Sequence, residues 1–134
     1  MAVIKRIDFI MQKFALFTGS INAMLAVMLG AFGAHGLKDR LTGEMLAVYQ
    51  TGVQYHFYHS LGLIIIGIIA FHVPASGLMK WSAGIMLAGI ILFSGSLYLL
   101  AITDLRWLGM ITPLGGTAFI ISWLLLAMAV LNFK

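Results

Sequence analysis

The sequence predicts an all-α integral membrane protein with four transmembrane helices and a short interfacial amphipathic helix between the first two. Of its 134 residues, 62% are hydrophobic and 9% are charged, and the mean hydropathy is +1.06. A soluble domain carries about 25% charged residues, so this chain lacks the polar side chains for a water-facing surface. Its uncharged stretches approach the ~20 residues that cross ~30 Å of hydrocarbon as a helix. We expect one domain, 1–134, with spans at 14–36, 55–72, 81–102 and 110–133.

The first span carries small residues at four-residue spacing on two stripes. Small residues let two helix backbones approach closely in a bilayer, where lipid gives no hydrophobic drive for helix packing. We expect both stripes to pack against the chain's own helices, with contact between two copies as the alternative. Gly36 is expected to cap the end of this helix. The stripes consist of Ala15, Gly19 and Ala23, and of Ala26, Gly30 and Ala34.

Residues 37–54 form the substantial polar stretch between the first two predicted spans. From Thr42 onward, apolar and polar side chains fall on opposite faces of a helix, and Thr42 itself suits an N-cap. We therefore expect a short helix at the membrane interface that runs, with or without a bend, into the second span.

The second span opens with the cluster Tyr55-His56-Phe57-Tyr58-His59 and ends before Pro74. Tyrosine at the start of a span matches the aromatic belt of a membrane interface. We therefore expect His35, His56 and His59 on one side of the membrane, near its surface.

The third and fourth spans contain small polar residues and glycines. Ser94-Gly95-Ser96 lies in the third span, and the fourth begins with Thr112-Pro113, followed by Gly115-Gly116. Proline is tolerated in the first turn of a helix or at a kink inside the membrane. We expect Pro113 in one of these two positions and an irregular turn at the glycine pair.

The net charge of +4 is better explained by membrane topology than by nucleic-acid binding. Nucleic-acid surfaces need a dense basic patch, whereas these cations are scattered at segment ends, so we exclude nucleic acid as a partner. By the positive-inside rule, five cations against three place both termini in the cytoplasm. A cleaved signal peptide is the alternative for the first span, although its apolar stretch exceeds the ~7–15 residues of a signal sequence. The larger group is Lys5, Arg6, Lys13, Lys80 and Lys134, and the smaller is Lys38, Arg40 and Arg106.

Few residues could perform chemistry. The chain has no cysteine, which excludes thiolate catalysis and Fe–S ligation. The predicted spans contain no Asp, Glu, Lys or Arg, which argues against a proton-coupled antiporter because such proteins need a buried ionisable group. A haem or metal held by His35 and His59 is conceivable, but hydrogen-bonding histidines are the stronger interpretation. We therefore expect no cofactor, no metal and no enzymatic activity.

Two stretches resemble a known family. Gly30–Leu37 with Tyr55 and Tyr58-His59-Ser60-Leu61, and Leu92–Ala101 with Ile111–Gly116, are similar to the two halves of the YgdD-type family. The resemblance implies a multi-pass, four-helix protein of the bacterial inner membrane, of unknown function. Gly43 stands where that family often has proline, and Asp104 where it often has glycine. The family signature falls on Gly33, His35, Gly36, Tyr55, His59, Ser94, Gly95, Ser96, Tyr98, Pro113, Gly115 and Gly116.

These observations favour a non-enzymatic accessory subunit or assembly factor of a membrane complex. Its partners would be the lipid bilayer and other membrane proteins or a second copy of itself. The first alternative is a small oligomeric channel or transporter for an uncharged or small ionic solute. The second alternative is the His-ligated haem or metal protein. A channel would be lined by Ser94, Ser96, Tyr98, Thr112 and Thr117.

Overall fold

The computed structural model describes residues 2–73 and 77–132, with side chains from Phe9 onward, and these residues form helices and turns without a strand. Four helical stretches are long and apolar enough to cross a membrane: Phe9–Leu37, Gly43–Ile69, Gly77–Thr103 and Arg106–Leu131. The predicted all-α class is confirmed. In chain order the elements are α1 (Ala2–Phe32), the π-helical turn η1 (Gly33–Leu37), α2 (Gly43–Ile69), α3 (Gly77–Gly89), the π-helical turn η2 (Ile90–Ser94), α4 (Gly95–Thr103), the 3-10 helix η3 (Arg106–Met110) and α5 (Thr112–Leu131).

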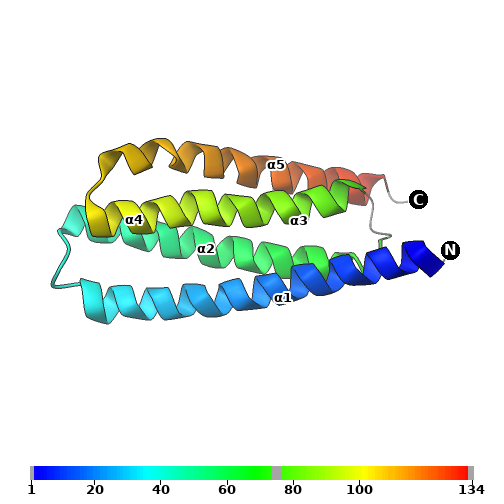
Figure 1. The fold of residues 1–134 in the computed structure, drawn as a ribbon, viewed down its shortest axis with the longest axis horizontal. Coiled ribbons are helices and arrows are strands. Elements are labelled where there is room, and N and C mark those ends of the chain that lie inside the picture. The colour runs from blue at the N-terminus through cyan, green and yellow to red at the C-terminus, as the bar shows by residue number, and fades with distance from the viewer. Residues whose placement is uncertain (1, 74–76, 133–134) are drawn as a thin grey trace.

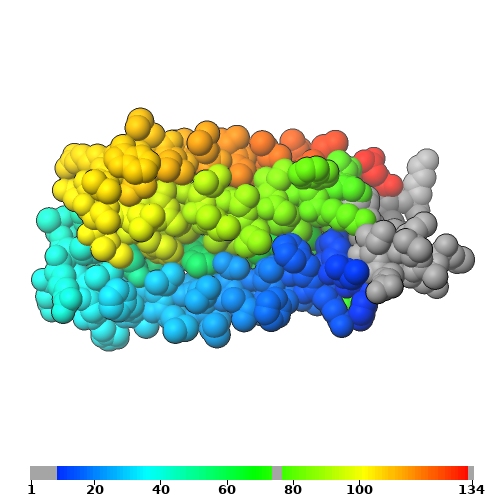
Figure 2. Space-filling model, viewed as in Figure 1, coloured from blue at the N-terminus to red at the C-terminus, as the bar shows by residue number. Residues whose placement is uncertain are grey.

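The four rods lie side by side as two pairs (Figure 1). α1 packs along α2, and α3 packs along α5, while α2 joins the two pairs through its contacts with η2 and α4. α1 begins at the end of the molecule where α5 finishes. On the face shown in Figure 2, α2 is visible between α1 and α4. The even number of candidate spans brings the start of α1 and the end of α5 to the same end of the bundle.

The amphipathic segment 43–54 runs without interruption into the second span as part of α2, Gly43–Ile69, which is one of the two expected arrangements. Thr42 caps this helix as predicted, with its hydroxyl oxygen accepting a hydrogen bond from Met45 N at 3.2 Å. The segment joins the bundle because its inner face fits there, and Tyr49 is only 1% exposed. Since α2 starts twelve residues earlier than the expected second span, His56 lies about 20 Å along the helix. Both His56 and His59 are buried inside the bundle, and their expected depth near the membrane surface stays a prediction.

Small residues of both stripes of α1 pack against α2, which confirms the expected packing within the chain in part, since Ala34 is exposed. A Cβ at Gly19 would come 2.9 Å from Ser60 O, and one at Gly30 would come 3.2 Å from Val53 Cγ1. Gly36 does not cap a helix in the left-handed conformation as predicted. It lies inside η1, and no glycine of the described residues has positive φ.

The third span contains a π-bulge that fits over a glycine of α5. A Cβ at Gly115 would overlap the backbone nitrogen and Cα of Phe93 in η2. Pro113 lies in the first turn of α5, which confirms one of its two expected positions. Asp104 ends α4 in the left-handed conformation, with φ 54°. That conformation suits glycine better than any other residue, which gives a physical reason for the glycine expected at this position from the resemblance.

Candidate functional site

A chain of hydrogen bonds joins three spans in the middle of the bundle. His56 of α2 places Nε2 3.1 Å from Asn22 Oδ1 of α1 and Nδ1 3.0 Å from Tyr98 Oη of α4. Both ring nitrogens are therefore engaged, and the ring is only 5% exposed. We call Asn22, His56 and Tyr98 the central triad.

The direction of each bond in the central triad follows from its neighbours. Asn22 Nδ2 donates to Thr18 O at 2.8 Å, so Asn22 Oδ1 is the atom that faces His56. An amide oxygen only accepts. Nε2 of a neutral His56 therefore donates to Asn22, and Nδ1 accepts the proton of Tyr98. Every polar atom of the neutral imidazole then has a partner, so the His56 ring links α1, α2 and α4 through hydrogen bonds.

The central triad continues into a second tyrosine. The Tyr49 ring lies 5.1 Å from the Tyr98 ring between centroids, and Tyr49 Oη donates to Leu29 O at 2.8 Å. A Cβ at Gly52 would come 3.0 Å from Tyr98 Cε1, so the absence of a side chain there makes room for the Tyr98 ring. Sequence reasoning missed Asn22 and Tyr49. A lone amide inside an apolar span is the signal that identifies Asn22, because a polar group there needs an interhelical partner.

Several of the sequence-predicted residues gather around the π-bulge. The His59 ring stacks on Phe119 with 3.4 Å between centroids, and its Nδ1 donates to Tyr55 O at 2.8 Å. The Tyr55 ring lies 4.6 Å from the Phe93 ring, next to the Gly115 contact. Tyr55, His59 and Gly115 are thus brought together, and their contacts are packing contacts.

The residues expected to line a pore are largely bonded to their neighbours. Ser96 Oγ lies 2.8 Å from Thr112 Oγ1, and Thr117 Oγ1 donates to Pro113 O at 2.9 Å. Ser94 is fully buried and its hydroxyl has no partner among the described residues. Gly95 has open space around its Cβ position, and at Gly116 the nearest atom would be 3.7 Å away. This arrangement does not favour a water-filled lining.

His35 and His59 do not meet, so the suggested ligand pair is not assembled. Gly33, beside His35, lies against the Tyr49 ring. His59 follows Tyr49 by ten residues, about 15 Å further along α2, and packs toward α5 rather than α1. His35 is exposed. The described residues contain no group of three or more His, Asp or Glu placed to hold a metal ion.

α2 also carries polar side chains on the face that points away from the bundle. Gln50 and Gln54 are exposed, and Tyr58 is 52% exposed. Gln54 Nε2 donates to Tyr58 Oη at 2.7 Å, and Gln50 has no side-chain hydrogen bond within the described residues. We call Gln50, Gln54 and Tyr58 the outer stripe. Below it the same face becomes apolar, with Leu61, Ile65 and Ile68 exposed.

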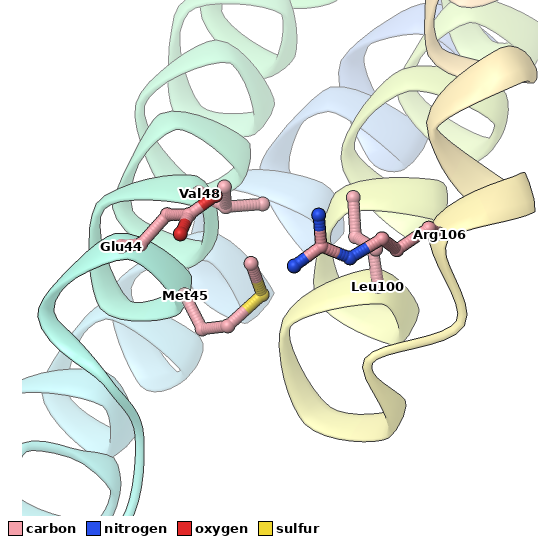
Figure 3. A pocket seen from close by; sticks show the side chains of 5 residues that line it. All are labelled: Glu44, Met45, Val48, Leu100 and Arg106. Carbon is pink, nitrogen blue, oxygen red and sulfur yellow. The ribbon is translucent and has the colours of Figure 1, made fainter.

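Charged residues surround two adjoining cavities at the end of the bundle where α2 begins and α4 ends. The first, about 210 Å³, lies between Glu44, Met45, Val48, Leu100 and Arg106. Figure 3 shows the Arg106 guanidinium reaching across Leu100 toward the α2 side chains. The second, about 290 Å³, shares Glu44, Met45 and Arg106 and adds residues of both connecting loops, among them Arg40 and Asp104.

Comparisons with known proteins agree with a membrane protein. Residues 29–116 match the family described as "Protein of unknown function (DUF423)". The chain is 50% identical to the UPF0382 membrane protein YwdK of Bacillus subtilis over 122 residues, which cover 91% of this chain and 99% of that relative. Identity is 46% to a UPF0382 membrane protein of Staphylococcus epidermidis and 44% to SAB0533 of Staphylococcus aureus, each over 91% of this chain and 98% of the relative.

No solved structure matches the chain. None of the relatives' names describes an enzymatic reaction. The match identifies a family of membrane proteins of unknown function, but it does not single out the YgdD-type family that the motifs resemble. On these matches the chain belongs to the DUF423 family, and it is an all-α membrane protein with four candidate spans.

Proposed function

We propose that this protein is a non-enzymatic subunit or assembly factor of a larger complex in the bacterial inner membrane, with both termini in the cytoplasm. Within the complex, a transmembrane helix of another protein packs against the outer stripe of α2. The observation that carries the proposal is the exposure of Gln50, Gln54 and Tyr58 on a helix that crosses the membrane.

The outer stripe reaches the depth of the lipid chains. Gln12 Nε2 donates to Ala70 O at 2.6 Å, so the end of α2 lies level with Gln12, beside Lys13. Counting back the ~20 residues that cross the hydrocarbon leads from Ala70 to about residue 51. Gln54 and Tyr58 fall inside this interval.

An exposed amide at that depth needs more partners than the chain supplies. A glutamine side chain offers two N–H donors and an oxygen with two acceptor positions, and Gln54 uses one donor, toward Tyr58. Lipid tails cannot satisfy the others. Hydrogen bonds between transmembrane helices contribute about 0.6 kcal/mol each, so a partner helix with polar side chains is stabilised against this face.

The extent of the stripe favours docking over conduction. The outer stripe changes to Leu61, Ile65 and Ile68 about halfway along α2, so this face offers no continuous row of polar groups for a solute to follow across the membrane. Inside the bundle, the polar side chains of the central triad are hydrogen-bonded among themselves, and Ser96 is hydrogen-bonded to Thr112. These arrangements support a protein that binds other helices rather than one that moves solutes.

The test is the native mass of the full chain, expressed at its natural level and extracted in a mild detergent. We expect a mass far above that of any small homo-oligomer, with other polypeptides separating from the complex in a denaturing second dimension. The double variant Gln54→Leu with Tyr58→Phe should run as the free chain. Both positions are exposed, and an apolar side chain is tolerated there in lipid or detergent, so we expect the double variant to fold.

Ser20→Leu is the matched control, because Ser20 is exposed on α1 rather than α2. It should keep the large mass. A wild-type chain that runs alone as a monomer, dimer or tetramer would contradict the proposal. So would a double variant that stays in the large complex.

A further inference from the structure

The two cavities between α2, α4 and η3 have a charged rim and an apolar wall. Glu44 and Arg106 stand on opposite sides of the smaller cavity, on α2 and η3 (Figure 3). Arg40 and Asp104 add a second charge of each sign in the adjoining cavity. Met45, Val48 and Leu100 form the wall below this rim. We call the smaller space the Glu44–Arg106 cavity.

The rim charges are free to bind a ligand. Arg106 Nε lies 4.0 Å from Asp104 Oδ1, with side chains 79% and 68% exposed, and an ion pair this open contributes little. Glu44 has no ion-pair partner among the described residues. A guanidinium can form two parallel hydrogen bonds to a phosphate, and a carboxylate accepts hydrogen bonds from an ammonium group.

The combination of charges selects for a zwitterion. Two cations and two anions cancel, so a purely anionic ligand gains no net attraction from the rim. A quaternary ammonium group is held by aromatic faces, and neither cavity is lined by an aromatic residue. A ligand with both a phosphate and a primary ammonium group fits the rim best.

The size and position of the cavity point to a lipid. The volume of about 210 Å³ suits a small head group but not a whole lipid. The apolar wall continues from the rim toward the spanning part of α2 and α4, where acyl chains would lie. A soluble zwitterion would gain nothing from that wall.

We propose that the Glu44–Arg106 cavity binds the head group of a phospholipid that carries a primary ammonium group, taken from the surrounding bilayer leaflet. Arg106, assisted by Arg40, holds the phosphate, and Glu44 and Asp104 hold the ammonium. Met45, Val48 and Leu100 contact the first carbons of the lipid. The site lies at the end of the bundle and does not include the outer stripe, so this proposal is independent of the proposed function.

The experiment compares three phospholipids with identical acyl chains. Phosphatidylethanolamine, phosphatidylcholine and phosphatidylglycerol are added separately to the purified full chain in detergent, and lipid retention is measured by native mass spectrometry alongside the unfolding temperature. We expect one retained phosphatidylethanolamine and a raised unfolding temperature with that lipid alone. Soluble phosphoethanolamine at the same concentration should have no effect.

Two variants test the two halves of the rim. Glu44→Gln should bind phosphatidylethanolamine about tenfold more weakly, reducing it to the level of phosphatidylcholine, because a charge-assisted hydrogen bond is lost. Arg106→Gln should abolish selective retention. Lys38→Gln is the control, since Lys38 is exposed at the same end but does not line either cavity.

Selectivity among the three lipids is compared within each variant. A loss of overall stability would lower the retention of all three lipids alike, so it cannot be mistaken for a loss of selectivity. Equal retention of all three lipids, stronger retention of phosphatidylglycerol, or unchanged selectivity in Glu44→Gln would overturn the proposal. Equal binding of soluble phosphoethanolamine would overturn the assignment to a membrane lipid.

Discussion

The two ends of this bundle are held together by different means. Toward the chain termini, the core consists mainly of aliphatic side chains, methionines and alanines with one buried pair of serines, and Leu63, Ile66, Met79 and Met86 have essentially no exposed surface. Toward the 38–42 loop, the core is built around Tyr49 and contacts Tyr98 of the central triad. We call these the terminal half and the loop half.

The difference shows where a membrane protein can be specific. Apolar side chains pack in the bilayer through shape alone, because lipid is as apolar as they are. Hydrogen bonds fix which atoms meet, and an unsatisfied polar group in lipid is costly. The loop half carries the central triad, the outer stripe and the Glu44–Arg106 cavity. Both proposed recognition sites, one for a partner helix and one for a lipid head group, lie in this half.

The largest expected effect comes from the junction of the two halves. Gly115→Ala would drive a methyl group into the Phe93 backbone, which cannot turn aside as the end of a flexible side chain can. We expect a loss of about 3 kcal/mol or more in the free energy of unfolding, measured by SDS-induced unfolding in mixed micelles. The neighbouring Gly116→Ala has 3.7 Å of room and should be nearly neutral. Equal effects at both glycines would show that the bulge does not fit over Gly115 as described.

The second effect concerns the central triad. His56→Phe keeps a ring but leaves Asn22 Oδ1 and the Tyr98 hydroxyl without partners, which should cost about 1–3 kcal/mol. Adding Asn22→Leu removes one of the two unpaired polar groups. The double variant should therefore lose less free energy of unfolding than the sum of the losses in the two single variants. His72→Phe, at an exposed position, is the control. Strictly additive losses would mean that Asn22 and His56 do not interact.

A smaller effect is expected from the polar pair of the terminal half. Ser82 Oγ donates to Ser122 O at 2.9 Å, and Ser122 Oγ donates to Ser82 O at 2.7 Å, so the pair is closed on itself. Replacing both serines by alanine removes both donors together and should cost about 1 kcal/mol in the same unfolding assay. A cost above that of His56→Phe would reverse the contrast between the two halves.

The smallest expected effect is an increase in the free energy of unfolding. Gly43 occupies the first position of α2. The preceding Thr42 is extended, with φ −63° and ψ 157°, and a Cβ on Gly43 would meet nothing within 4 Å. Proline suits this position. Gly43→Pro should therefore raise the free energy of unfolding by about 0.4–1 kcal/mol through the unfolded state. Loss of stability would show that α2 does not begin at this residue.

The helical class and the spans could be predicted because apolar length and charge depletion decide them. The start of α2 could not, because the amphipathic pattern from Thr42 to Gln54 describes an interfacial helix and a bundle helix equally well. The burial of Tyr49 and Gly52 against other spans decides between them. With this boundary, His56 lies about 20 Å from the start of its helix rather than in the first turn of a span.

The candidate site was predicted only in part. Tyr55, His59 and Gly115 do gather near the π-bulge, and Ser96 Oγ donates to Phe93 O within it, but His35 lies apart from them and is exposed. The pairing of Asn22 with His56 joins residues 34 positions apart, and the Glu44–Arg106 cavity joins residues of α2 and η3. Neither can be read from local spacing, because each depends on how the helices are placed beside one another.

The most direct test of the central claim uses a photoreactive amino acid placed at residue 54, and separately at residue 20, in living cells. Both positions face away from the bundle, so they differ mainly in whether the outer stripe is nearby. The proposed function predicts a discrete higher-mass protein adduct from position 54 and only lipid adducts from position 20. Lipid adducts alone at both positions would contradict it.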